Sequence, residues 1–176
     1  MPNVIIVRND YPDAKSLCRV INYVLKNENL AGGYGVPPNL EAAYLQMQFV
    51  KRAFYQTDAL QLKHFFITLS HTEAAYIDDD ELLKLGFLTG ELFREYQMVY
   101  GVHHDGSHDH LHVVMNTTSF LDGHQYCDGL SMFNRLCDML RQKYPRFEVH
   151  LGYSHRRFSK DEPFSEEDRY QYNMFN

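Results

Sequence analysis

The chain has 176 residues, of which 44% are hydrophobic and 14% aromatic, and its formal net charge is −6. This length and apolar content allow one sizeable core, so we expect a single folded domain and exclude extensive disorder. The negative charge excludes a protein that coats nucleic acid indiscriminately, because such binding needs an excess of Lys and Arg, but it leaves room for a localised basic groove.

The first third of the chain predicts one strand and two helices. Residues 3–7 are rich in β-branched side chains, which is typical of a buried strand. Residues 13–26 predict a helix, because apolar residues recur there at the helical period: Leu17, Val20, Ile21 and Val24. A segment rich in Gly and Pro, residues 32–38, then breaks the chain. Residues 39–55 predict a second helix with Asn39 as its N-cap.

The middle of the chain predicts a strand at residues 62–70 and a helix at residues 78–96. The helix begins with a run of acidic residues: Asp78, Asp79, Asp80 and Glu81. Because the dipole at a helix N-terminus favours negative charge, this run indicates a helix start rather than a metal site.

Two further strands are predicted at residues 97–103 and 110–117, joined by a connection of hairpin length. Residues 131–143 predict a last helix, and residues 147–151 a last short strand. Strands paired through a hairpin, with helices between other strands, indicate the α+β class. We expect a two-layer sandwich in which helices flank a central antiparallel sheet.

We assign residues 1–158 to this domain and residues 159–176, which are polar and acidic, to a C-terminal tail. No apolar run approaches the ~18 residues that cross a membrane, and the N-terminus lacks the basic start and the cleavage site of a secretory signal. The cysteines, odd in number and without CxxC spacing, give little support to disulfides or a zinc ribbon. We therefore expect a cytoplasmic protein without a membrane partner.

Five of the ten histidines lie in the stretch VHHDGSHDHLHVVMN, residues 102–116. Alternate side chains of a strand share a face, so His110 and His112 point the same way, and an antiparallel hairpin places His103 across from them. Three imidazoles on one patch of a rigid sheet predict a metal site with open positions for water or substrate. The alternative is a chance clustering of surface histidines.

Other residues of this stretch have smaller predicted roles. Asp105 is a candidate to orient a ligand histidine by accepting its second N–H group. His104 belongs to the opposite face and His108 to the predicted loop, so both are weaker ligand candidates.

The order His103, Asp105, His108, His110, His112, Asn116 resembles the His-hydrophobic-His (HUH) motif of the relaxases, the mobilisation nucleases that nick plasmids and conjugative elements. KHFFITLSH (63–71), QMVYGVHHD (97–105) and SFLDGHQY (119–126) are similar to segments of that family in the same order. INYVLK (21–26) resembles the family's segment around its nucleophilic tyrosine. The candidate tyrosine precedes the histidines, which favours MobA- and VirD2-like relaxases over rolling-circle replication initiators. The resemblance covers roughly residues 1–150.

This resemblance implies a metal-dependent transesterification of DNA. His103, His110 and His112 match the family's metal ligands, with Mg or Mn expected and Zn, Ni or Co compatible with imidazole. Tyr23 would attack single-stranded DNA at an origin of transfer and form a 5′-phosphotyrosyl protein with a free 3′-hydroxyl. Accessory mobilisation proteins would be further partners.

Tyr23 also stands out by its position on the predicted helix. Arg19 lies four residues before it and Lys26 three residues after it, so both cations share its face. Neighbouring cations favour the phenolate and bind phosphate, so we expect the pKa of Tyr23 below ~10. The alternative is a tyrosine at the edge of the core with its hydroxyl in water.

The remaining candidates are His64, Asn116 and a basic segment. His64 either faces the site, as a phosphate-binding residue or one that orients a metal ligand, or is a core histidine. Asn116 hydrogen-bonds the backbone or DNA, and a structural use is favoured. The basic segment is a candidate DNA track: Arg141, Lys143, Arg146, Arg156 and Arg157.

Two other classes of function stay open. A nuclease-inactive protein that binds DNA or assists mobilisation would keep the fold without cleavage, so strand cleavage that depends on Tyr23 separates it from a relaxase. An unrelated His-ligated metalloenzyme, such as an iron oxygenase, would use His103, Asp105 and a distant histidine as ligands. Bound iron and oxygen consumption would favour that class.

Overall fold

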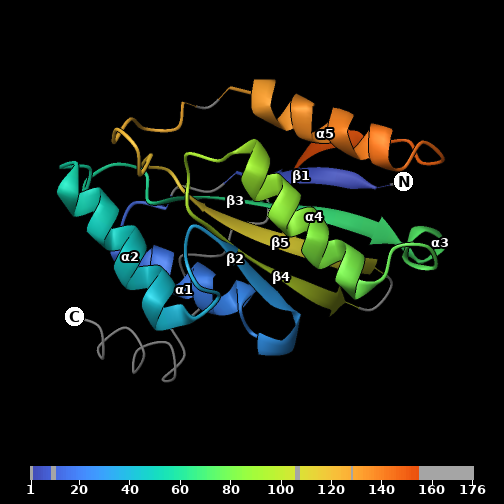
Figure 1. Cartoon of the computed structure of the whole chain (residues 1–176), viewed down its shortest axis with the longest axis horizontal. Coiled ribbons are helices and arrows are strands. Elements are labelled where there is room, and N and C mark those ends of the chain that lie inside the picture. Colours follow the sequence, from blue (N-terminus) through green and yellow to red (C-terminus); the bar gives the residue numbers. More distant parts are fainter. Residues whose placement is uncertain (1, 9–10, 106–107, 128, 155–176) are drawn as a thin grey trace.

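A computed structural model describes residues 2–8, 11–105, 108–127 and 129–154 (Figure 1). Within these ranges six strands form one sheet in the order β2-β4-β5-β3-β1-β6. The strands are β1 (Asn3–Val7), β2 (Ala31–Tyr34), β3 (Leu62–Ser70), β4 (Met98–Asp105), β5 (His108–Asn116) and β6 (His150–Ser154). Neighbouring strands are antiparallel, apart from the parallel pair of β1 and β6.

Helices cover both faces of the sheet (Figure 1). They are α1 (Ala14–Val24), α2 (Leu40–Ala53), α3 (His71–Ala74), α4 (Asp79–Leu92) and α5 (Ser131–Lys143), with a 3-10 turn, η1 (Glu28–Leu30). The cluster of α1 and α2 packs on one face, and that of α4 and α5 on the other. The expected α+β class with a central sheet flanked by helices is therefore confirmed. The expectation of two layers and a purely antiparallel sheet is corrected: both sheet faces carry apolar side chains that helices cover, which gives three layers, and the β1–β6 pair makes the sheet mixed.

Three helices begin directly after a side chain that caps their N-terminus. Asp13 accepts a hydrogen bond from the backbone N–H of Ser16 at 2.7 Å, and Asn39 accepts one from Ala42 at 3.1 Å. The acidic run is a helix start as expected, because Asp78 accepts from the backbone N–H of Glu81 at 2.9 Å. No helix in the described ranges is long and apolar enough to cross a membrane.

Strand β2 was not expected, since its sequence AGGY looks like a chain break. Gly32 is required by a tyrosine far along the chain. A Cβ atom on Gly32 would lie 2.2 Å from Cε2 of Tyr100, so only glycine lets β2 pair with β4 beside that ring. A requirement set by a distant partner leaves no signal in the local sequence.

Several element ends differ from the sequence expectation. Helix α4 ends at Leu92, and β6 lies at His150–Ser154 rather than at residues 147–151. The hairpin strands are longer than expected, because β4 extends to Asp105 and β5 begins at His108. The paired part of β5 thus includes His108, which was expected in the loop.

The helices α1 and α2 cover only part of their sheet face. Leu62, Val99 and Val114 pack beneath them. His64, two residues after Leu62 on β3, and His112, two residues before Val114 on β5, lie on the same sheet face beyond the helices. The sheet face is therefore covered at one end and continues into a histidine-rich surface at the other.

Candidate active site

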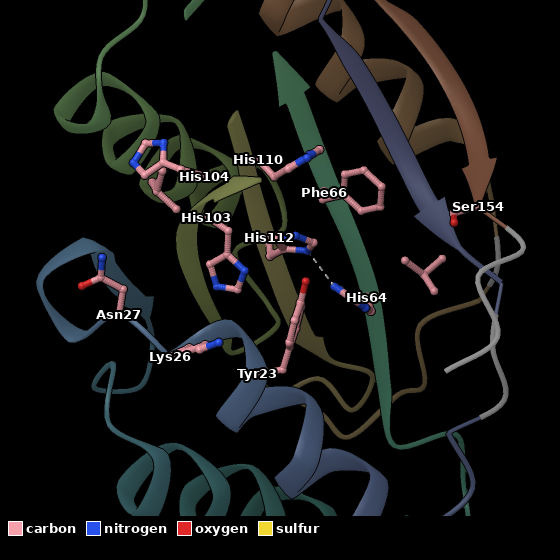
Figure 2. Close-up of a pocket in the computed structure, with 12 residues that line it drawn as sticks. Tyr23, Lys26, Asn27, His64, Phe66, His103, His104, His110, His112 and Ser154 are labelled. Atoms are coloured by element: carbon pink, nitrogen blue, oxygen red, sulfur yellow. Dashed lines mark hydrogen bonds between the residues drawn. The ribbon is translucent and has the colours of Figure 1, made fainter. Parts of the chain in front are cut away.

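A pocket with a volume of about 490 Å³ opens on this histidine-rich part of the sheet, beside the C-terminal end of α1 (Figure 2). Seven residues named as candidates in the sequence line it: Tyr23, Lys26, His64, His103, His104, His110 and His112. They come from three strands, from the end of α1 and from the turn that follows it. Rigid elements on several sides thus hold the candidate catalytic groups.

Strand register brings the three candidate ligands together. In the β4–β5 hairpin His103 pairs directly with His110, as expected, and Gly101 pairs with His112. The ring centroids of His103 and His112 lie 4.8 Å apart, and those of His110 and His112 lie 5.8 Å apart. All three imidazoles therefore belong to one patch.

His104 points away from that patch, as strand alternation predicts. Its Nδ1 lies 2.7 Å from a carboxylate oxygen of Asp109, and its Nε2 lies 3.3 Å from one of Asp79, at the start of α4. The hydrogen bond to Asp109 raises the pKa of His104. Its ring also lines the pocket, because β2 pairs only with Met98–Gly101 and leaves this part of β4 at the edge of the sheet.

Helix α1 places Tyr23 against the histidines. Its ring lies edge-on to those of His103, His112 and His64, with centroid distances of 5.0, 5.2 and 6.3 Å. The hydroxyl end of Tyr23 points toward His112 (Figure 2). The ring is half-buried, while its neighbour Val24 is fully buried and anchors the end of α1 on the sheet.

His103 is fixed to the end of α1. Its Nε2 lies 3.1 Å from the carbonyl oxygen of Val24, so an N–H at Nε2 donates to that oxygen. Because a neutral imidazole carries one proton, Nδ1 is then the nitrogen of His103 with a lone pair to offer.

His64 is buried and adjoins the site at the same time. It is 1% exposed, and its Nε2 lies 3.1 Å from Nδ1 of His112. On its other side Nδ1 lies 3.4 Å from the hydroxyl of Tyr11. Burial, with a smaller contribution from His103, lowers the pKa of His64 to about 3, so this imidazole is neutral at pH 7.

The donor set suits a divalent metal ion, because three imidazoles line one pocket. Two imidazoles that bind one ion at ~2.1 Å have ring centroids ~4.6–5.3 Å apart. The His103–His112 centroid distance of 4.8 Å lies in this range. The His110–His112 distance of 5.8 Å is slightly too long, and the ring of His110 lies 5.6 Å from that of Phe66. Among the described residues, no three His, Cys, Asp or Glu side chains are already arranged to hold an ion. The imidazoles therefore suit a metal ion chemically, and the ring of His110 has to turn before all three can bind the same ion.

Comparison with known families agrees with this geometry. Residues 23–145 match the family described as "Relaxase: MobA/VirD2-like, nuclease domain". The chain belongs to this relaxase family. The matched region begins at Tyr23 and includes the histidines of the pocket, whereas β1 and β6 lie outside it. No curated protein and no solved structure matches the relaxase.

Some expected residues of the relaxase lie elsewhere. Asn116 is fully buried, and its amide donates to Gln97 at 3.1 Å and to the carbonyl of Met47 at 3.3 Å, which is a structural role. Arg19 and His108 are not among the residues that line the pocket. Lys26 lines it from the turn after α1, since the helix ends at Val24, and not from the helix face that the sequence predicts.

Of the basic residues expected as a DNA track, the three that the structure describes, Arg141, Lys143 and Arg146, do not line this pocket. Helix α5 packs on the opposite sheet face, where Arg141 bonds Asp138 and the carbonyl of Val149, both at 2.7 Å. Lys143 pairs with Glu81 of α4 at 2.8 Å, and Arg146 follows α5 on the exposed surface. Arg156, Arg157, the tail 159–176 and the side chain of Asp105 lie outside the described residues.

The structure adds residues that the sequence expectation did not select. Phe66 lines the pocket next to His64, and its place on the same strand face was visible in the sequence. Tyr11 and Ser154 had no such signal. Tyr11 reaches His64 across the fold, and Ser154 lies at the pocket because β6 pairs with β1.

Proposed function

We propose that this protein is a metal-dependent relaxase that cleaves single-stranded DNA at an origin of transfer, with Tyr23 as nucleophile. The observation that carries the proposal is the position of Tyr23, whose ring lies 5.0 Å from that of His103 and 5.2 Å from that of His112. Distant segments of the chain thus bring a phenol and three imidazoles into one pocket of a protein of the relaxase family.

His103, His110 and His112 would hold the divalent ion, which supplies positive charge for the scissile phosphate when it is bound. Mg or Mn is the expected ion, and Zn, Ni or Co would also suit imidazole nitrogen.

The chemical step exchanges one phosphodiester for another. The phenolic oxygen of Tyr23 forms a bond to phosphorus, and the bond between phosphorus and the 3′-oxygen breaks. The phenol releases its proton to solvent, and the departing 3′-oxygen takes up a proton. A 5′-phosphotyrosyl protein and a free 3′-hydroxyl result, and the step is reversible because the number of phosphodiester bonds does not change.

Other lining residues suit the backbone and bases of a single strand. Lys26 and Asn27 are exposed at the pocket, where an ammonium and an amide can bind phosphate oxygens. Phe66 and Val7 form an apolar part of the lining, on which an unpaired base can stack. These groups bind DNA locally, which is compatible with a net charge of −6.

The test is the formation of a covalent adduct. We expect the protein, incubated with Mn(II) and a pool of labelled single-stranded oligonucleotides, to give a denaturation-resistant protein–DNA adduct at Tyr23, located by peptide mass spectrometry. Tyr23→Phe should abolish the adduct. Tyr55→Phe is the matched control, because Tyr55 is 93% exposed and does not line the pocket.

Retention of the adduct in Tyr23→Phe would assign the nucleophile to another residue. Absence of any adduct in the wild-type protein, with Mn(II) shown to be bound, would favour a nuclease-inactive protein that binds DNA or assists mobilisation.

A further inference from the structure

We infer that His64 and Tyr11 are positioning residues that set which nitrogen of His112 carries the proton, so that Nε2 of His112 is the atom offered to a metal. This inference takes its functional meaning from the metal-dependent relaxase proposed above. The hydrogen-bonded chain on which it rests is a property of the protein by itself.

The three side chains form a continuous buried chain. Nε2 of His64 lies 3.1 Å from Nδ1 of His112, and Nδ1 of His64 lies 3.4 Å from the hydroxyl oxygen of Tyr11. Tyr11, His64 and His112 are 3%, 1% and 7% exposed, so water does not compete for these contacts. In Figure 2 the ring of His64 lies beside that of His112, on the side away from His103.

Two imidazole nitrogens at 3.1 Å share a single proton, which leaves two possible arrangements. In the first, Nδ1–H of His112 donates to His64, and Nδ1–H of His64 is directed at the Tyr11 oxygen. In the second, Nε2–H of His64 donates to His112, and His112 then carries its own proton on Nε2.

Metal binding distinguishes these arrangements. In the first, Nε2 of His112 has a lone pair available, whereas in the second a proton occupies it and prevents coordination. A histidine that binds metal normally donates its other N–H to an acceptor, and His64 stands where that acceptor is needed. Tyr11 completes the chain by offering its oxygen to the remaining N–H of His64.

His64 also differs in charge from the usual acceptor of a metal-binding histidine. A carboxylate commonly fills this position and offsets part of the metal's positive charge, whereas a neutral imidazole does not. With Nε2 placed to accept from His112 and Nδ1 placed to donate to Tyr11, the acceptor is an imidazole that carries a single proton. The described part of the pocket lining contains no Asp or Glu that would replace it.

The experiment uses metal-stripped, full-length protein and two measurements. ¹⁵N NMR of the imidazoles should find His112 of the wild-type protein protonated at Nδ1 before any metal is added. Calorimetric titration with Mn(II) should show a 10- to 100-fold loss of affinity in His64→Leu, the range typical for loss of such an acceptor. His64→Gln, whose amide oxygen can accept a hydrogen bond from His112, should recover most of the Mn(II) affinity. Tyr11→Phe should lower the Mn(II) affinity a few-fold.

A proton on Nε2 of His112 in the metal-free wild-type protein would overturn the inference. Unchanged Mn(II) affinity in folded His64→Leu and Tyr11→Phe would overturn it as well. If circular dichroism shows that His64→Leu does not fold, Tyr11→Phe and the NMR measurement decide. The adduct assay separates the two proposals: a wild-type protein with this dependence on His64 but no adduct leaves the inference standing and refutes the cleavage activity.

Discussion

Gly101 of β4 lies directly against Val24 at the end of α1. A Cβ atom on Gly101 would lie 2.1 Å from the carbonyl oxygen of Val24, so the contact admits no side chain. The same carbonyl oxygen accepts the hydrogen bond from Nε2 of His103, at 3.1 Å. Because Tyr23 directly precedes Val24, this approach of helix to strand sets the distance between Tyr23 and the histidines.

Gly101→Ala is therefore expected to impair cleavage more than it impairs folding. The methyl group must push the last turn of α1 away from β4, and a displacement of ~1 Å at a reacting group costs roughly 100-fold in rate. Overpacking should also lower the free energy of unfolding by ~1–3 kcal/mol. Single-turnover rates of adduct formation measure the effect. Gly129→Ala is the control, because the nearest atom would be 3.9 Å from its Cβ. A folded Gly101→Ala protein with the wild-type rate would refute this account.

The buried His64 predicts a stability that falls in mild acid. Its pKa is lowered to about 3 by burial, whereas in the unfolded chain a histidine has a pKa of ~6.5. Below pH ~6.5 the unfolded state binds a proton that the folded state does not, so this contribution is complete above pH ~6.5 and decreases as the pH falls toward 3.

Between pH ~6.5 and pH ~3, His64 should lower the free energy of unfolding by on the order of 1 kcal/mol for each pH unit of acidification. Urea unfolding of metal-free protein between pH 7 and pH 4.5 measures it, with His64→Gln as the comparison that lacks the titrating group. Parallel pH profiles for the two proteins would show that His64 does not titrate in this way.

Phe66 is expected to contribute to single-strand affinity. Stacking of a base on an aromatic ring contributes ~1–3 kcal/mol, so loss of the ring should weaken binding by roughly 5- to 100-fold. Phe66→Leu retains apolar packing against the neighbouring His110 and His112 rings while it removes the aromatic face. Fluorescence anisotropy with a labelled oligonucleotide at fixed salt gives the affinity. Phe49→Leu serves as control, since Phe49 is 71% exposed on α2, and equal losses in both variants would contradict a specific role.

The three histidines proposed as metal ligands should differ from other histidines in metal binding. His112→Ala, which removes one of three expected ligands, should weaken Mn(II) binding at least 10-fold, and EDTA should stop adduct formation reversibly. His71→Ala, an exposed histidine at the start of α3, should bind Mn(II) as the wild-type protein does. Equal Mn(II) affinity of the wild-type protein and both variants would show that the metal does not bind in this pocket.

Asn116→Ala should destabilise the fold and leave the chemistry intact. The substitution removes the amide that donates to Gln97 and to the carbonyl of Met47 in a fully buried position. Loss of buried partners of this kind costs ~1–3 kcal/mol. Chemical denaturation measures this loss. A wild-type free energy of unfolding combined with a large loss of DNA cleavage would instead place Asn116 in the site.

The local sequence determined most secondary structure and the core of the histidine cluster. Capping by Asn39 and Asp78 and the stripe on α1 depend on residues within a few positions of each other. The pairing of His103 with His110 also follows locally, because a short hairpin fixes its own register. Period-2 alternation then placed His110 and His112 on one face.

Contacts between distant segments determined the rest, and they have no local signature. The pairing of β6 with β1 brings Ser154 to the pocket, and the fold places Tyr11 beside His64. The sequence favoured α5 as a DNA track because its basic residues cluster, but only packing decided that α5 covers the opposite sheet face. The sequence nominated Tyr23 through family resemblance and through the two cations predicted to share its helix face. Its position against His103 and His112 depends on where α1 docks, which is set by the absent side chain of Gly101.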